Sequence, residues 1–109
     1  MATAPAKSKE VFEYLKNCAK EMRTVSYEEI ADVCGLAPAG MGTPLGYIRD
    51  EICAKRALPW INALAVSKGA RRPSDGFLPH GVSLSGSEEQ FWRGMVLLVL
   101  AFDWSQVNF

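Results

Sequence analysis

The residue types that most often bind metals or act as nucleophiles are few in this chain. Its 109 residues include three cysteines, Cys18, Cys34 and Cys53, and one histidine, His80. The cysteines show no Cys-x-x-Cys spacing, and a structural zinc site needs about four ligands of these types. The sequence therefore predicts neither a metal site nor another cofactor. It favours reduced, mostly buried thiols in a cytoplasmic protein.

The remaining candidates do not indicate nucleophilic catalysis either. His80 lies between a proline and a glycine and shares no motif with a carboxylate, while Ser83, Ser85 and Ser87 are typical of turns and helix caps. An activated serine or cysteine needs a general base or a stabilising charge beside it. We therefore expect that the protein is not an enzyme.

The charged residues are balanced overall but unevenly distributed. Lysine plus arginine equals aspartate plus glutamate at 12 each, so net charge does not attract nucleic acid. This balance counts against a strong non-specific DNA binder, whose affinity comes largely from phosphate neutralisation. Residues 49–72 carry two acidic residues, Asp50 and Glu51, and six basic ones: Arg49, Lys55, Arg56, Lys68, Arg71 and Arg72. The three cations around Gly69 are the best candidates for phosphate contacts.

Two helices are predicted in the first third of the chain. Apolar residues at helical spacing predict an amphipathic helix from Ser8, its cap, to about Met22. Ser26 and Glu29 form a capping box that opens a short second helix, and Gly35 ends it. A loop is predicted over residues 36–42.

A third helix is predicted from Thr43, because threonine is a common cap and proline is favoured at the first helical position. Its inner stripe is Leu45, Ile48 and Ile52, and its outer residues are Tyr47, Arg49, Asp50, Lys55 and Arg56. A recognition helix contacts DNA through such outer side chains. A solvated helix face explains them equally well.

A small β-wing is predicted after Pro59, which ends the helical region. The sequence predicts a strand over residues 60–66, a turn over 67–70, a loop or short strand over 71–76 and a brief return over 77–78. This order of elements is that of a winged helix-turn-helix. The predicted fold class is therefore mostly α with a small β-wing.

The C-terminal region follows a linker over residues 79–86. Ser87 and Gln90 cap a last helix with two apolar stripes, one of Phe91, Met95, Leu98 and Phe102 and one of Trp92, Val96 and Val99. A helix this apolar on two faces is buried or pairs with a partner. We expect residues 1–7 to be disordered, residues 8–104 to form a single winged-helix-like domain, and residues 105–109 to be a tail.

No segment of the sequence is typical of targeting or of a membrane span. The N-terminal residues lack an apolar signal-peptide core, and the apolar run over residues 94–102 is too short to cross a bilayer. We therefore expect no membrane partner and a cytoplasmic location.

Several short motifs resemble one family of DNA-repair proteins. They are Ser26-Tyr27-x-x-Ile30-Ala31, then Gly35, then Leu45-Gly46, then Pro59-Trp60. In this order they resemble the DNA-binding domain of the O6-alkylguanine-DNA alkyltransferases, over residues 24–77. The enzymes have an acceptor cysteine after the proline, in Pro-Cys-His-Arg. Their non-catalytic alkyltransferase-like relatives replace that cysteine, commonly with tryptophan, so Pro59-Trp60 is most similar to the relatives.

The resemblance implies binding in the DNA minor groove without alkyl transfer. The family's tyrosine, which presses on a target phosphate, corresponds to Tyr27. The arginine that fills the gap left by a flipped base has no counterpart, because Met41 or Thr43 occupies its region. Ile61 and Asn62 replace His-Arg. A degenerate alkyltransferase with a displaced acceptor is not expected, since no cysteine follows a proline or precedes His-Arg.

The predicted partner is double-stranded DNA, including alkylated or otherwise altered DNA. The candidate contacts are Tyr27, Thr43, Tyr47, Arg49, Arg56, Trp60, Asn62, Lys68, Arg71 and Arg72. Tyr27 can instead be a half-buried packing residue, and Trp60 can anchor a strand rather than line a base pocket. The alternative function is a protein-interaction or regulatory module on the same scaffold. It would use the apolar C-terminal helix to form a homodimer or bind another protein, without DNA.

Overall fold

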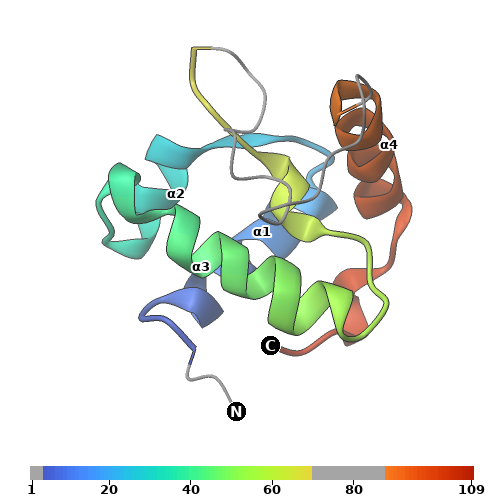
Figure 1. Cartoon of the computed structure of the whole chain (residues 1–109), viewed down its shortest axis with the longest axis horizontal. Helices are drawn as coiled ribbons and strands as arrows, with labels where there is room; N and C mark the ends of the chain where they lie inside the picture. Colours follow the sequence, from blue (N-terminus) through green and yellow to red (C-terminus); the bar gives the residue numbers. More distant parts are fainter. Residues whose placement is uncertain (1–3, 70–87) are drawn as a thin grey trace.

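A computed structural model of the chain describes residues 4–69 and 88–109 (Figure 1). The described part is mostly helical with a small sheet of two parallel strands, as the mostly α prediction requires. In chain order the elements are α1 (Ser8–Lys20), β1 (Val25–Ser26), α2 (Tyr27–Cys34), η1 (Pro38–Gly40), α3 (Gly42–Tyr47), η2 (Ile48–Ala54), η3 (Ile61–Leu64), β2 (Ala65–Val66), α4 (Glu88–Ala101) and η5 (Trp104–Gln106).

The first helix buries the apolar side that its sequence pattern predicted. Val11, Phe12, Leu15 and Cys18 are all fully buried. The predicted cap was wrong: Lys7 occupies the cap position in a left-handed conformation and Ser8 is the first helical residue. The Ser8 hydroxyl is buried without a hydrogen-bond partner.

The second helix begins and ends where predicted. The Ser26 side chain accepts a hydrogen bond from the Glu29 backbone N–H at 3.0 Å, and Gly35 ends the helix with a positive φ of 74°. A left-handed conformation of this kind favours glycine. The Glu29 carboxylate accepts hydrogen bonds from Tyr14 and Arg23. It therefore ties the start of α2 to α1.

The third helix is one continuous segment made of α3 and η2. Its cap is Met41 rather than the predicted Thr43, so it begins at Gly42, two residues before the predicted first helical residue, Pro44. Its last seven residues are wound as a π-helix. The predicted inner stripe of Leu45, Ile48 and Ile52 is buried, as expected. In Figure 1 this segment crosses in front of α1.

The predicted strand over residues 60–66 was largely wrong. Residues 61–64 form the 3₁₀ turn η3, and only Ala65 and Val66 form a strand. A short continuous apolar run does not distinguish a strand from a buried helical turn, which explains the error. Strand β2 pairs with β1 in parallel, Val25 with Ala65 and Ser26 with Val66, so this pair is not a hairpin wing. Several predictions lie outside the described residues: the loop or short strand over 71–76, the return over 77–78, the linker, the Ser87 cap and residues 1–3.

The C-terminal helix α4 has one buried and one exposed side. On the buried side, Trp92 donates a hydrogen bond to the carbonyl of Ala63 at 2.8 Å, and Val99 is fully buried. In the predicted stripe of Phe91, Met95, Leu98 and Phe102, the first two residues are half-buried and the last two are exposed, so the fold of one chain buries only part of this stripe. No helix among the described residues combines the length and apolar character needed to cross a bilayer.

The last residues of the chain pack against the core, although the sequence predicted only a tail. The Phe109 ring contacts the rings of Phe12 and Tyr47, with centroids 5.9 and 6.0 Å apart. Lys16 donates a hydrogen bond to the Val107 carbonyl at 2.7 Å. These contacts hold the C-terminus against α1 and α3.

We expect Phe109→Ala to lower the free energy of unfolding by about 1–2 kcal/mol, because it removes two aromatic contacts of a half-buried ring. Urea unfolding of the full chain measures this change. Asn108→Ala is the matched control, since that side chain is exposed and only its backbone carbonyl accepts a hydrogen bond, from Arg56. Equal stability of the two variants would contradict the packing of the C-terminus.

Candidate nucleic-acid interface

The short parallel sheet determines which candidate residues lie near one another. Because β1 and β2 run in the same direction, the chain leaves both strands at the same end. After Ser26 it continues into α2 with Tyr27, and after Val66 it continues into the turn of Ser67 and Lys68. Paired strands lie about 5 Å apart. The start of α2 and the turn after β2 therefore lie side by side.

This end of the sheet is suited to an anion. The N-terminus of a helix carries a partial positive charge, and its backbone N–H groups point outward. Lys68 is exposed in the adjacent turn, and Tyr27 is half-buried, with its ring packed against the core. Glu28 is an exposed carboxylate in the same helical turn and opposes an anion. The site therefore combines favourable groups with one unfavourable charge.

The second carboxylate of that turn is occupied within the fold. Glu29 accepts hydrogen bonds from the Tyr14 hydroxyl and from Arg23, whose guanidinium nitrogen lies 3.0 Å away. These hydrogen bonds lower the pKa of Glu29, and the one from Tyr14 has the larger effect. Arg23 also pairs with Glu21 at 2.8 Å. Sequence analysis missed this network, because only the docking of α1 on α2 brings Tyr14 to Glu29.

The third-helix candidates are mostly engaged within the protein. Thr43 is exposed at the start of α3. Arg49 was predicted to lie outside, but only 11% of its side chain is exposed, and it makes two hydrogen bonds to Asp50, at 2.7 and 2.8 Å. This pairing lowers the pKa of Asp50.

Two further candidates of the third helix contact the C-terminus. The Tyr47 ring is half-buried against Phe109, and Arg56 donates a hydrogen bond to the Asn108 carbonyl. Arg56 is otherwise exposed. These contacts favour structural roles for both side chains.

Trp60 and Asn62 lie before β2, away from the turn that follows it. The half-buried Trp60 ring packs edge-on against Phe91 of α4, with centroids 5.6 Å apart, and its backbone N–H donates to the Met95 sulfur at 3.2 Å. Asn62 is 5% exposed, and its Oδ1 atom has no hydrogen-bond partner. Both of these contacts join Trp60 to α4. Arg71 and Arg72 lie outside the described residues.

The thiols are poorly placed for chemistry. All three cysteines are free and buried. Burial raises the pKa of Cys18 and of Cys53 to about 11, and it also raises that of Cys34. A thiol reacts as the thiolate, so raised pKa values reduce its reactivity near neutral pH. Within residues 4–69 and 88–109, no three histidine, cysteine or carboxylate side chains gather as a metal site.

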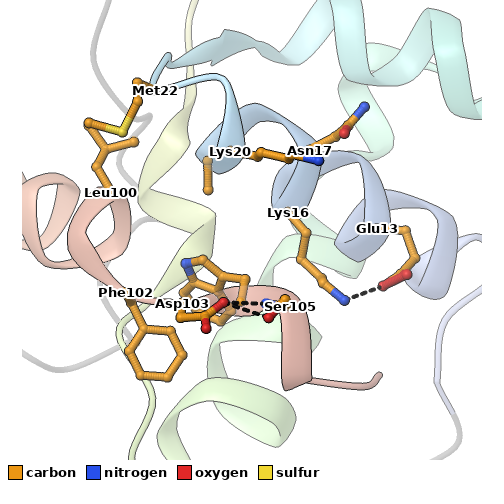
Figure 2. Close-up of a pocket in the computed structure, with 11 residues that line it drawn as sticks. Glu13, Lys16, Asn17, Lys20, Met22, Leu100, Phe102, Asp103 and Ser105 are labelled. Atoms are coloured by element: carbon orange, nitrogen blue, oxygen red, sulfur yellow. Dashed lines mark hydrogen bonds and ion pairs between the residues drawn. The ribbon is translucent and has the colours of Figure 1, made fainter.

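Sequence analysis also missed a surface pocket of about 510 Å³ between α1 and the C-terminal end of α4. Figure 2 shows Lys16 and Lys20 of α1 on one side and Phe102, Asp103 and Ser105 on the other. Asp103 accepts hydrogen bonds from the backbone N–H and the hydroxyl of Ser105. The pocket arises from the docking of two segments distant in sequence, for which the sequence carries no local signal.

Comparison of the chain with protein-family models, curated proteins and solved structures found no significant match.

The Glu29 network predicts a specific dependence of stability on pH. A carboxyl whose pKa is lowered on folding stabilises the protein above its ordinary pKa, and this contribution is lost as pH falls through the lowered value. We therefore expect Glu29→Gln to be less stable than the wild type near neutral pH. The difference in the free energy of unfolding between the two proteins should shrink as pH falls from about 6 to about 3.

Urea unfolding at several pH values measures this difference. Glu28→Gln is the matched control, since Glu28 is the exposed neighbour in the same turn. A stability difference for Glu29→Gln that is constant with pH would contradict the role of the network.

Proposed function

We propose that this protein binds double-stranded DNA without catalysis, in the manner of the alkyltransferase-like proteins that its motifs resemble, and that it recognises alkylated or otherwise altered DNA. The observation that carries the proposal is the parallel β1–β2 pairing, which puts Tyr27 at the start of α2 beside the turn of Lys68. The proposed winged helix-turn-helix has α2 and the α3–η2 segment as its helical pair.

The phosphate contacts are assigned to this end of the sheet. Helix N-termini, tyrosine hydroxyls and lysines commonly contact DNA phosphates. Tyr27 would donate to one phosphate while Lys68 neutralises it or its neighbour. Arg71 and Arg72 follow Lys68 closely in the sequence and add two positive charges. The exposed Glu28 and the balanced net charge indicate modest, salt-sensitive affinity.

Trp60 is assigned to the base-recognition part of the site. Stacking of a base on an aromatic ring contributes about 1–3 kcal/mol. Trp60 is half-buried, and its ring packs edge-on against Phe91. In the motif resemblance, its position corresponds to that of the acceptor cysteine of the alkyltransferases. The buried thiols with raised pKa values support binding without alkyl transfer, in a protein of the cytoplasm.

Fluorescence anisotropy with a plain duplex and a duplex containing O6-methylguanine tests this proposal. We expect tighter binding to the modified duplex and weaker binding as salt rises. Tyr27→Phe keeps the packed ring but removes the hydroxyl, so it should weaken binding to both duplexes. Lys68→Ala should also weaken binding to both duplexes. It should make the negative slope of log affinity against log salt shallower by about one.

Lys9→Ala is the matched control, because Lys9 is an exposed lysine in the first turn of α1, away from β1 and β2. Intact mass of the protein after incubation with the modified duplex should show no added methyl group. The absence of binding to either duplex at low salt would contradict the proposal. Equal affinity for the two duplexes would support DNA binding but contradict recognition of the alkylated base.

The second candidate function is a protein-interaction module. The observation that favours it is the exposure of two large apolar side chains on α4, Leu97 at 69% and Leu98 at 58%. Exposed apolar patches on small proteins often mark interaction surfaces. This function needs no contact between DNA and the start of α2.

A further inference from the structure

The pocket between α1 and the C-terminal end of α4 has the size of a small-molecule site. Its volume of about 510 Å³ lies within the range of roughly 300–1,000 Å³ that is typical of ligand pockets. Its lining includes the buried Ala19 and Trp104 and the half-buried Leu100. Met22 and Phe102 add two exposed apolar side chains. This lining is suited to the apolar part of a ligand.

Met22 is the least expected residue of the lining. It follows the last turn of α1 with a positive φ of 59°, a left-handed conformation that favours glycine. Its backbone N–H donates to the Ala19 carbonyl, and the next N–H, of Arg23, donates to the Cys18 carbonyl. This pair of hydrogen bonds marks a helix end at which glycine is usual. The Met22 side chain is 64% exposed, so the core does not require it either. It lines the pocket instead (Figure 2).

Among the described residues, four charged side chains line the pocket, and two of them neutralise each other. Lys16 pairs with Glu13 at 3.4 Å and also donates a hydrogen bond to the Val107 carbonyl. Lys20 and Asp103 lie on opposite sides of the pocket in Figure 2. Within the described part of the chain, neither of them forms an ion pair. The pocket therefore presents one positive and one negative group to a ligand.

The Asp103 carboxylate is oriented by Ser105. Its Oδ1 atom accepts hydrogen bonds from the Ser105 hydroxyl, at 2.6 Å, and from the Ser105 backbone N–H, at 3.0 Å. These hydrogen bonds, chiefly that from the hydroxyl, lower the pKa of Asp103, so the group is ionised near neutral pH. Asp103 also lies two residues after the end of α4, where the partial negative charge of a helix C-terminus favours a cation. This side of the pocket is therefore suited to an ammonium group.

Lys20 supplies the positive charge on the opposite side. Its side chain is exposed, and Asn17, one helical turn earlier, lines the pocket with it. An ammonium and an amide both donate hydrogen bonds to carboxylate oxygens. The C-terminus of α1 opposes a bound anion, but the carbonyls of Asn17, Cys18 and Ala19 already accept backbone hydrogen bonds. This side of the pocket is therefore suited to a carboxylate.

We infer that the pocket binds a free α-amino acid with a large apolar side chain. The carboxylate of the ligand pairs with Lys20, its ammonium pairs with Asp103, and its side chain contacts Met22 and the apolar lining. A simple anion would leave Asp103 without a partner, and a simple cation would leave Lys20 without one. Both charges are exposed to water, which weakens each contact, so we expect a dissociation constant of about 0.1–1 mM.

Amide proton–nitrogen spectra of the labelled full chain, titrated with L-phenylalanine in the absence of DNA, test this inference. We expect saturable shifts of the amides of residues 16–22 and 100–105. Three analogues each lack one matched group: 3-phenylpropionate lacks the ammonium, 2-phenylethylamine lacks the carboxylate, and glycine lacks the apolar side chain. Each analogue should bind at least about fivefold more weakly than L-phenylalanine. Equal binding of any analogue, or no saturable shift up to about 10 mM L-phenylalanine, would overturn the inference.

Met22→Gly separates binding from folding. Glycine adopts the left-handed conformation without a steric penalty, so this variant should be at least as stable in urea as the wild type. It should nevertheless bind L-phenylalanine at least about threefold more weakly, because it loses an apolar contact with the ligand. A variant that keeps both its stability and its affinity for L-phenylalanine would overturn the role of Met22 and with it the proposed site.

Asp103→Asn keeps an oxygen that accepts from Ser105 but removes the negative charge. It should weaken binding of L-phenylalanine and leave binding of 3-phenylpropionate unchanged, because only the first ligand carries an ammonium. Asp32→Asn is the matched control, since Asp32 is an exposed carboxylate of α2. An equal loss in both variants, or no loss in Asp103→Asn, would overturn the inference. Because no DNA is present, these outcomes are independent of the proposed DNA binding.

Discussion

The pairing of β1 with β2 connects two parts of the chain that are forty residues apart in sequence. Only two residues of each strand take part, but Val25, Ala65 and Val66 are all buried there, so the pairing lies inside the core. It fixes where α2 begins and where the chain turns after Val66. Breaking it would separate Tyr27 from Lys68, and the proposed phosphate site would then have no defined geometry.

The local features of the fold were predictable from the sequence, because short-range chemistry decides them. Ser26 and Gly35 bound α2 through a side-chain hydrogen bond and a left-handed conformation, and neither needs a distant partner. The apolar stripe of α1 likewise follows from helical periodicity alone. The fold class, mostly helical with a small sheet, followed from these elements.

The features that depend on tertiary contacts were not predictable. The apolar run over residues 61–64 is compatible with a strand and with a buried turn. It forms a turn because it is buried among α1, η2 and α4. Arg49 was expected outside, whereas its guanidinium is largely buried and makes two hydrogen bonds to Asp50. Phe109 showed no pattern at all, since its partners, Phe12 and Tyr47, are far away in sequence. Of the candidate site, the sequence indicated Tyr27 and Lys68 separately, but not that they are neighbours.

The two proposed surfaces belong to different parts of the molecule. The phosphate site lies at the end of the sheet, and the exposed side of α4, with Leu97 and Leu98, points away from the core on the side opposite η3. Trp60 lies between them in the fold, because its ring packs on Phe91 of α4 while its chain continues through η3 into β2.

The most direct test of the account is to ask whether the two segments joined by the sheet bind DNA together. Amide proton–nitrogen spectra of the labelled protein, recorded during titration with a short duplex, report this residue by residue. We expect the amides of residues 26–29 and 67–69 to shift together and with the same midpoint. Shifts confined to α4, or no shifts at a duplex concentration that saturates binding, would contradict the proposed interface.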